Sequence, residues 1–370
     1  MTRVLITGGA GFIGSHTSDV LLDAGYQVTL LDNLTPQVHG PARQPPSYLN
    51  PEADLIIGDV TDPAAVDRAL RGVDLVLHLA STVGVGQSMY DMVSYVHNNE
   101  VGTATLLEAL AKRPVARLVV ASSMSVYGEG LCRDAAKRLV NPDERSTRQL
   151  RSARWELEDA NGRELVPVPT PETKSPSLSS VYALNKYAQE RLCLMVGKSY
   201  GIPAAALRFF NVYGPRQALS NPYTGVLAIF AARFLNGRSP MVFEDGRQRR
   251  DFVHVLDVAN ACRLALESEC DGEVFNIGSG QSRSILSVAN DLAKVMGRRD
   301  LKPLVTGKYR AGDIRHCFAD IEKSRTLLNF NPRVEFTRGL EELAEYLAGQ
   351  IADDHVEKAT KELERRGLVA

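Results

Sequence analysis

The chain has 370 residues, and 43 Lys and Arg against 44 Asp and Glu give it a formal net charge of −1. A near-neutral chain without a basic block excludes nucleic acid as an expected partner, and no apolar stretch approaches the ~18 residues of a membrane-spanning helix. The five cysteines are scattered and form no C-x-x-C pair, which disfavours a metal site or a disulfide framework and predicts a reducing, cytoplasmic location.

The first predicted elements surround a glycine-rich loop. Val4–Thr7 is an apolar run typical of a buried strand, and Ser15–Ala24 follows as a predicted helix. Between them the sequence TGGAGFIG places Gly8, Gly11, Phe12, Ile13 and Gly14 at a helix N-terminus. Backbone N–H groups and the helix dipole favour a pyrophosphate there. Taken alone, the loop also fits a tight strand-to-helix turn that holds no ligand.

The next three predicted strands have informative residues at their carboxyl ends. They span Gln27–Asp32, Asp54–Ile57 and Leu75–Leu79. Asp32 follows Gly14 by 18 residues, close to the ~20-residue offset at which a carboxylate binds the ribose hydroxyls of NAD. The same carboxylate would repel the 2′-phosphate of NADP. Further cofactor contacts are expected from Asn33 after the second strand, Asp59 and Val60 beside the adenine, and Leu79 and Ala80 at the end of the fourth strand.

Helical segments alternate with these strands through the first half of the chain. The predicted helices cover Pro63–Leu70, Val93–Lys112 and Val181–Ser199, and two further strands cover Arg117–Ser122 and Ala204–Arg208. This alternation is typical of an α/β fold, a doubly wound parallel sheet of the Rossmann type with helices on both faces.

One long segment interrupts the alternation. Glu129–Pro176 is rich in Arg, Glu, Ser and Pro and connects a strand to the helix that carries Tyr182. So long a connection is usually functional or mobile. We expect it to form a wall or lid over a substrate, the alternative being a disordered surface excursion. Near the end of the chain, Ile351–Arg366 is predicted to be a charged helix.

A second motif supplies chemistry. Tyr182 and Lys186 lie four residues apart, so a helix places the phenol and the ammonium on one face. A lysine in that position is expected to lower the pKa of the tyrosine, because a nearby positive charge favours the phenolate. A dinucleotide loop together with such an acid/base predicts redox chemistry on an alcohol.

With these motifs assembled, the chain resembles the extended short-chain dehydrogenases/reductases that act on nucleotide sugars as epimerases and dehydratases. The motifs that carry the resemblance include TGGAGFIG, Ser122-Ser123, Tyr182-x-x-x-Lys186, LRFFNVYGP from Leu207 and RDFVHV from Arg250. It implies an NAD-binding Rossmann domain over 1–207 with the insertion 129–176, a smaller domain for the nucleotide-diphosphate sugar over 208–347, and a charged tail over 348–370. Residues 249–268 are expected to return to the first domain, and the protein to form a homodimer.

The resemblance also implies roles for individual residues. Tyr182 takes a proton from a sugar hydroxyl, Lys186 supports it and holds the nicotinamide ribose, and Ser123 donates to the same sugar oxygen. Asn99 and Ser122 join the expected cofactor contacts. The expected substrate contacts are Met124 near the sugar, Asn211, Arg250 and Arg310 at the diphosphate, and Asp313 beside Arg310.

The residues after Ser123 narrow the expected reaction. Resembling dehydratases have an Asp-Glu pair here and resembling decarboxylases a glutamate two positions before the Tyr-Gly, whereas this chain has Met124 and Ser125. Neither moves a proton at neutral pH. The expectation is therefore 4-epimerisation of a dTDP- or UDP-hexose, a 6-deoxyhexose, glucose or glucuronate. A dehydratase, a 4-keto reductase and a non-catalytic sensor of NAD or nucleotide sugar remain as alternatives.

Overall fold

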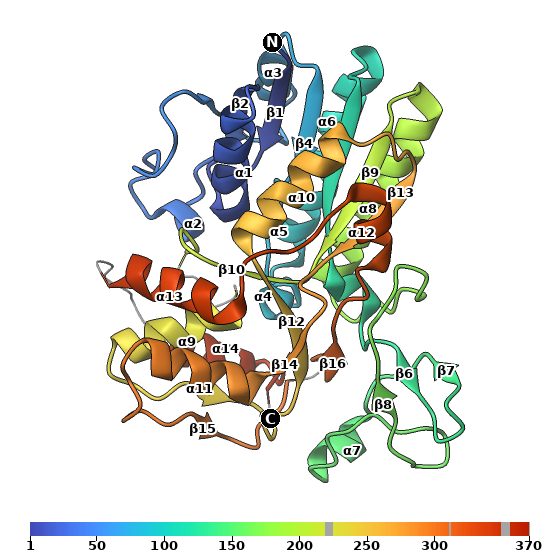
Figure 1. Cartoon of the computed structure of the whole chain (residues 1–370), viewed down its shortest axis with the longest axis vertical. Helices are drawn as coiled ribbons and strands as arrows, with labels where there is room; N and C mark the ends of the chain where they lie inside the picture. Colours follow the sequence, from blue (N-terminus) through green and yellow to red (C-terminus); the bar gives the residue numbers. More distant parts are fainter. Residues whose placement is uncertain (219–224, 311, 349–355, 370) are drawn as a thin grey trace.

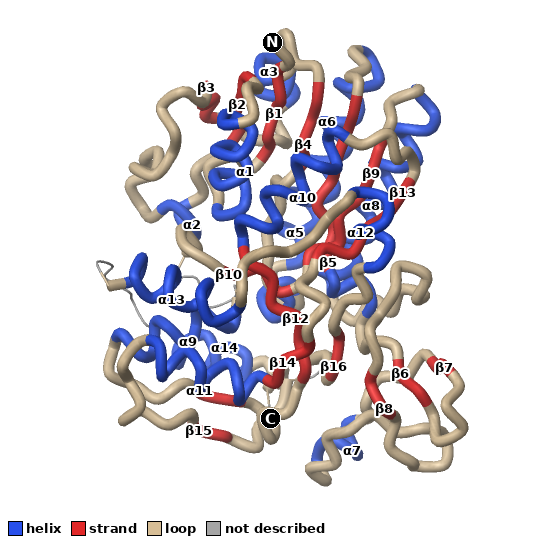
Figure 2. Tube along the Cα trace, viewed as in Figure 1, coloured by secondary structure: helices blue, strands red, loops and turns tan. Residues whose placement is uncertain are grey.

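A parallel seven-stranded sheet forms the centre of the computed structural model, which describes residues 1–218, 225–310, 312–348 and 356–369. Its strands lie in the order β13 (Glu273–Ile277), β9 (Ala204–Phe209), β5 (Arg117–Ser123), β4 (Leu75–His78), β1 (Arg3–Thr7), β2 (Gln27–Asp32) and β3 (Asp54–Ile57). The strands stand side by side in the upper part of the molecule (Figures 1 and 2). The predicted doubly wound α/β fold is confirmed.

Both faces of the sheet are covered because its strands are apolar on both sides. One face packs on α1 (Phe12–Asp23), α10 (Val255–Glu267) and α12 (Glu322–Leu328). The other packs on α3 (Pro63–Ala69), α6 (Gly102–Lys112) and α8 (Val181–Tyr200). The strand order reverses between β1 and β4, and open sheets of this type bind ligands at the carboxyl ends of the strands at such a point.

The six strands predicted from the sequence agree with the structure to within about a residue at each end. The seventh strand, β13, was not predicted, since its short run Glu273–Ile277 lies in the segment expected to bind the sugar. The predicted helix Val93–Lys112 is interrupted: α5 (Met92–Val96) and α6 are joined by a π-helical turn, η1 (His97–Val101). Such turns often occur at functional sites.

The second half of the chain builds a smaller part below the sheet (Figure 1). Its strands are β10 (Asn211–Tyr213), β12 (Arg249–His254), β14 (Ser282–Ser284) and β16 (His316–Cys317), with a separate pair β11 (Met241–Val242) and β15 (Leu304–Val305). Helices α9 (Val226–Leu235), α11 (Ile285–Val295) and α13 (Phe336–Leu347) share an apolar core beside them. α10 leaves this part and packs against α1, within the layers of the seven-stranded sheet.

Glu129–Pro176 folds as a small lobe, which lies at the lower right of Figure 1. It contains a three-stranded sheet of β7 (Leu139–Val140), β6 (Cys132–Arg133) and β8 (Val166–Pro167), and one helix, α7 (Thr147–Arg151). A few apolar side chains, among them Cys132, Leu157 and Leu165, form its core. The alternative of a disordered excursion does not fit this ordered arrangement.

The last described helix is α14 (Val356–Arg365). The predicted tail helix Ile351–Arg366 overlaps it, and the part of that prediction over 351–355 lies outside the described residues. No helix among the described residues is long and apolar enough to cross a membrane.

Candidate active site

A cavity of about 830 Å³ opens at the carboxyl ends of the central strands. Most of the residues predicted from the sequence line it: Gly8, Gly11, Phe12, Ile13, Gly14, Asp32, Asn33, Asp59, Val60, Leu79, Ala80, Ser122, Ser123, Met124, Tyr182, Lys186, Asn211, Arg250, Arg310 and Asp313. Residues from both halves of the chain therefore meet at one site.

The glycine loop forms a cradle at one end of this cavity. Gly8 has φ +69°, a conformation that side chains rarely adopt, and Gly11 caps α1. A Cβ on Gly14 would lie 2.5 Å from the Gly8 carbonyl oxygen, so only glycine allows the helix to start this close to the strand. The open face of the loop and the N-terminus of α1 fit a pyrophosphate.

Asp32 ends β2 beside this loop. Its carboxylate accepts hydrogen bonds from the backbone N–H groups of Ala10 (3.0 Å) and Leu34 (2.9 Å), which fix its orientation. A carboxylate has about four acceptor sites, so it can still accept ribose hydroxyls. Nearby, Asn33 donates to the Asp59 carboxylate at 2.8 Å. These residues fit the adenosine half of NAD.

Asn99 is placed differently from the prediction. It is fully buried, and it is absent from the described residues that line the cavity. Its side chain accepts from the Thr82 N–H (2.7 Å) and donates to the Thr82 carbonyl (3.0 Å). Asn99 therefore holds a loop whose residues Ser81 and Thr82 line the cavity, while Asn98 reaches the cavity itself.

Ser123, Tyr182 and Lys186 come together at the other end of the cavity. The Ser123 side chain hydrogen-bonds the phenol of Tyr182. The Tyr182 backbone N–H donates to Ser88 Oγ at 3.0 Å, and Ser88 belongs to α4 (Val85–Ser88). Lys186 Nζ donates to Gln189 Oε1 at 2.8 Å. Sequence reasoning missed Gln189, although its position three residues after Lys186 puts it on the same helix face.

The expected lowering of the Tyr182 pKa is wrong for this arrangement. Burial raises the pKa of Tyr182 to about 12, and the hydrogen bond from Ser123 offsets this only in part. Burial also lowers the pKa of Lys186 to about 7. Removal from water is the largest cause for both groups, because it penalises each charged form.

Ser122 contributes to the site through a buried ion pair. Its hydroxyl donates to Glu190 at 2.8 Å, and Glu190 accepts two hydrogen bonds from Arg208, at 2.9 and 2.7 Å. The Arg208 guanidinium also lies 4.7 Å from the centre of the Tyr127 ring. This group ties β5 to α8 and β9, the elements that carry Ser123 and Tyr182.

The expected diphosphate ligands lie on the side of the cavity formed by the second half of the chain. Arg310 is paired with Asp313 at 3.0 Å and stacks over the Phe243 ring at 4.9 Å. Arg250 lies 3.9 Å from Asp313 and donates to the backbone carbonyls of Arg249 and Arg315. Burial alone would raise the pKa of Asp313, but the positive charges lower it overall, and Arg310 has the largest lowering effect.

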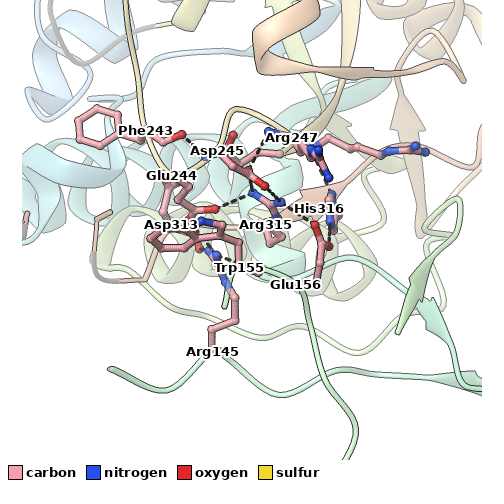
Figure 3. A network of polar contacts seen from close by, with 12 residues as sticks. Arg145, Trp155, Glu156, Phe243, Glu244, Asp245, Arg247, Asp313, Arg315 and His316 are labelled. Carbon is pink, nitrogen blue, oxygen red and sulfur yellow. Dashed lines mark hydrogen bonds and ion pairs between the residues drawn. The ribbon is translucent and has the colours of Figure 1, made fainter. Parts of the chain in front are cut away.

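A buried polar network supports this side (Figure 3). Arg315 is fully buried and pairs with Glu156 (2.6 Å), Glu244 (2.8 Å) and Asp245 (2.6 Å). Arg145 pairs with Glu244 at 2.8 Å and donates to the Asp313 carbonyl at 2.8 Å. Hydrogen bonds from His316 and Arg315 lower the pKa of Glu156 to about 2.

The lobe Glu129–Pro176 acts through this network. None of its residues, all of which the structure describes, lines the large cavity. Glu129, Glu144, Arg145 and Leu150 of the lobe line a smaller pocket, which shares Ser179, Asp313 and Ile314 with the large one. That the lobe forms a wall or lid over the substrate stays a prediction. Arg145 and Glu156 of the lobe also hold the segment that carries Arg310 and Asp313. Among the described residues, no group of His, Cys, Asp and Glu is arranged to hold a metal ion.

Comparison with known proteins gives this geometry a context. The model of the NAD dependent epimerase/dehydratase family matches residues 4–150 and 160–278. The chain belongs to this family. A dTDP-L-rhamnose 4-epimerase from Burkholderia thailandensis is 36% identical over 354 residues, which cover 94% of this chain and 96% of that protein.

Solved structures agree with that assignment to the epimerase/dehydratase family. The UDP-glucose 4-epimerase of Thermotoga maritima, with UDP-glucose bound, superposes with a TM-score of 0.76 at 31% identity, covering 94% of this chain and 99% of that one. The UDP-glucuronic acid 4-epimerase of Bacillus cereus, in complex with UDP-glucuronic acid and NAD, gives a TM-score of 0.73 at 30% identity, covering 94% and 99%.

Proposed function

We propose that the protein is an NAD-dependent nucleotide-sugar 4-epimerase that acts on a dTDP- or UDP-hexose. The observation that carries the proposal is the meeting of Ser123, Tyr182 and Lys186 with the glycine loop and Arg310 in one cavity. The family membership and the relatives named as 4-epimerases support it.

The chain's own residues perform the proton chemistry. Tyr182 takes the proton of the sugar 4-hydroxyl, and Ser123 donates a hydrogen bond to the same oxygen as it becomes a carbonyl. NAD, held by the glycine loop and Asp32, would supply the hydride acceptor and donor, and the keto sugar would turn about its diphosphate linkage between the two transfers. Arg250 and Arg310 hold the diphosphate during that turn, since guanidinium groups suit phosphate oxygens.

Met124 and Ser125 separate this reaction from dehydration or decarboxylation. Met124 is buried at 6% exposure beside Ser123, and the Ser125 N–H donates to Ser123 Oγ at 3.1 Å. Neither side chain can carry a proton to or from the neighbouring carbons. The keto sugar is therefore reduced again and loses neither water nor carbon dioxide.

Incubation with UDP- and dTDP-sugars, with product stereochemistry determined by NMR, tests the proposal. We expect inversion at C4 of at least one sugar by protein that carries its own NAD, with no net NADH release. A requirement for stoichiometric NAD, or a dehydrated product, would contradict it.

The rate should depend on pH through the Tyr182–Lys186 pair. Below the Lys186 pKa of about 7 both groups are protonated, and above it the pair has lost one proton. When the pair has lost one of these two protons, the other can pass from the Tyr182 phenol to the Lys186 amine. Only this state therefore gives a phenolate beside an ammonium. We expect kcat to rise up to about pH 7 and then level off. Lys186→Arg, which does not titrate, should abolish that inflection in the measured profile.

The proposal includes a homodimer in the cytoplasm. Apolar side chains are exposed along α5, η1 and α8, namely Met92, Val93, Val101, Leu184 and Met195. α5 and α8 pack against each other, so these side chains offer a surface for a second copy. Sedimentation at micromolar concentration determines the oligomeric state.

A further inference from the structure

The last helix, α14, and the residues that follow it line part of the cavity. Glu364 pairs with Lys308 at 2.5 Å, and Val369 forms a backbone bridge with Arg310. On the other side, the Arg366 guanidinium lies 4.3 Å from the centre of the Tyr90 ring. Tyr90 follows α4 in the first half of the chain, while Lys308 and Arg310 belong to the second. The helix is therefore anchored to both walls of the cavity.

Four residues of this terminal segment line the cavity: Ala359, Thr360, Leu363 and Leu368. Leu363 is only 7% exposed and packs on Gly86, where a Cβ would lie 3.4 Å from its side chain. Gly86 belongs to α4, and Ser88 of the same short helix accepts the hydrogen bond of the Tyr182 N–H. Leu363 is thus connected through this short helix to the amino end of α8, the helix that carries Tyr182.

The side of α14 that faces the cavity carries no charge among these four lining residues. Glu362 of the helix pairs instead with Arg365 at 2.8 Å and with Arg366, just after the helix, at 2.7 Å. Val83, Val85 and Met89 extend the apolar lining on the α4 side, and Met124 contributes beside Ser123. Apolar side chains from α14, from the α4 segment and from the residue after Ser123 therefore line the cavity beside polar ones such as Thr360 and Ser125.

We propose that α14 is a wall of the sugar subsite, and that Leu363 makes the enzyme prefer a nucleotide sugar with a methyl group at C6 over one with a hydroxymethyl or carboxylate group. The inference rests on the proposed epimerase function. A hydroxyl held against Leu363 loses its hydrogen bonds to water, and a carboxylate loses far more solvation. A methyl group gains from the same contact.

The size of this selectivity is limited by its physical origin. An apolar pocket rejects an added hydroxyl by about 10–100-fold. We therefore expect the wild-type kcat/KM for a 6-deoxyhexose to be about 10–100-fold higher than for the same hexose with its 6-hydroxyl. The kcat/KM for the hexuronate should be lower than both.

The test compares Leu363→Asn with Lys361→Ala in the NAD-loaded full chain. The amide introduced by Leu363→Asn would offer the 6-hydroxyl a hydrogen-bond partner, whereas Lys361 is an exposed residue of the same helix and serves as the control. The probes are dTDP-6-deoxyglucose with dTDP-glucose, dTDP-L-rhamnose with dTDP-L-mannose, and dTDP-glucuronate. Free dTDP, which lacks the sugar, is titrated by calorimetry alongside them.

We expect Leu363→Asn to reduce the preference for the deoxy sugar at least fivefold in affinity and kcat/KM, with free dTDP binding unchanged, and Lys361→Ala to match the wild type. Leu363→Met, which keeps the apolar contact, should retain the preference and guards against misfolding of the Asn variant. An unchanged ratio in Leu363→Asn, a wild-type preference for the hydroxylated or acidic sugar, or weakened binding of free dTDP would overturn the inference. Because calorimetry measures binding without turnover, failure of epimerisation would be recognised separately.

Discussion

Replacing Tyr182 with Phe is expected to remove almost all epimerase activity while leaving NAD bound. The ring still fills its buried position in α8, but the oxygen that takes the sugar proton is absent. Loss of a positioned acid/base costs about 10²–10⁴-fold in rate. The hydrogen bond between Ser123 and the Tyr182 phenol is lost as well, so the Ser123 hydroxyl is no longer oriented beside the sugar oxygen.

The matched control for this variant is Tyr200→Phe. Tyr200 is the last residue of the same helix and is 53% exposed, so its hydroxyl makes no contribution to the cavity. We expect kcat with the accepted nucleotide sugar to fall only in Tyr182→Phe, and the bound NAD, measured after denaturation, to be equal in both. Wild-type turnover by Tyr182→Phe would refute the assignment of Tyr182 as the proton acceptor.

Replacing Arg315 with Met is expected to cause the largest loss of stability. The guanidinium is fully buried and pairs with Glu156, Glu244 and Asp245. Methionine fills a similar length but leaves these carboxylates without that partner, and Glu244 is itself buried. Breaking a buried pair by removing one partner costs about 3–5 kcal/mol.

Denaturant unfolding of Arg315→Met measures that loss, and Arg247→Ala is its control. Arg247 lies in the segment of Glu244 and Asp245, and its side chain is exposed, so its removal should change the free energy of unfolding by less than about 0.5 kcal/mol. Because the network also holds the segment of Arg310 and Asp313, we expect the KM for the nucleotide sugar to rise in Arg315→Met. Equal stability of the two variants would show that the carboxylates find other partners.

Local pattern was sufficient to predict the sheet that positions the site. Apolar runs such as Val4–Thr7 and Leu75–Leu79 are strands because they are buried on both faces, and the polar or glycine residues after them mark the carboxyl ends. The gathering of Gly14, Asp32, Ser123 and Tyr182 at one edge follows from that arrangement. The spacing of these residues along the chain was therefore enough to predict that they form one site.

Features that depend on distant parts of the chain were not predictable in this way. β13 is a strand because it pairs with β9, and Asn99, which lies in a π-helical turn, is bonded to Thr82, 17 residues earlier in the chain. The pKa values of Tyr182 and Lys186 follow from burial, which their spacing does not reveal. The position of the lobe depends on ion pairs such as Arg145–Glu244 between segments about a hundred residues apart.

The bridge between Val369 and Arg310 has a practical consequence for handling the protein. A purification tag or fusion partner at the carboxyl end would begin close to Val369, and therefore close to Arg310, an expected diphosphate ligand, and to α14, which lines the cavity. One joined before Met1 would leave from the opposite end of the molecule (Figure 1). Preparations tagged at the two ends should differ in KM for nucleotide sugars, so kinetic work is best done with the tag at the amino end.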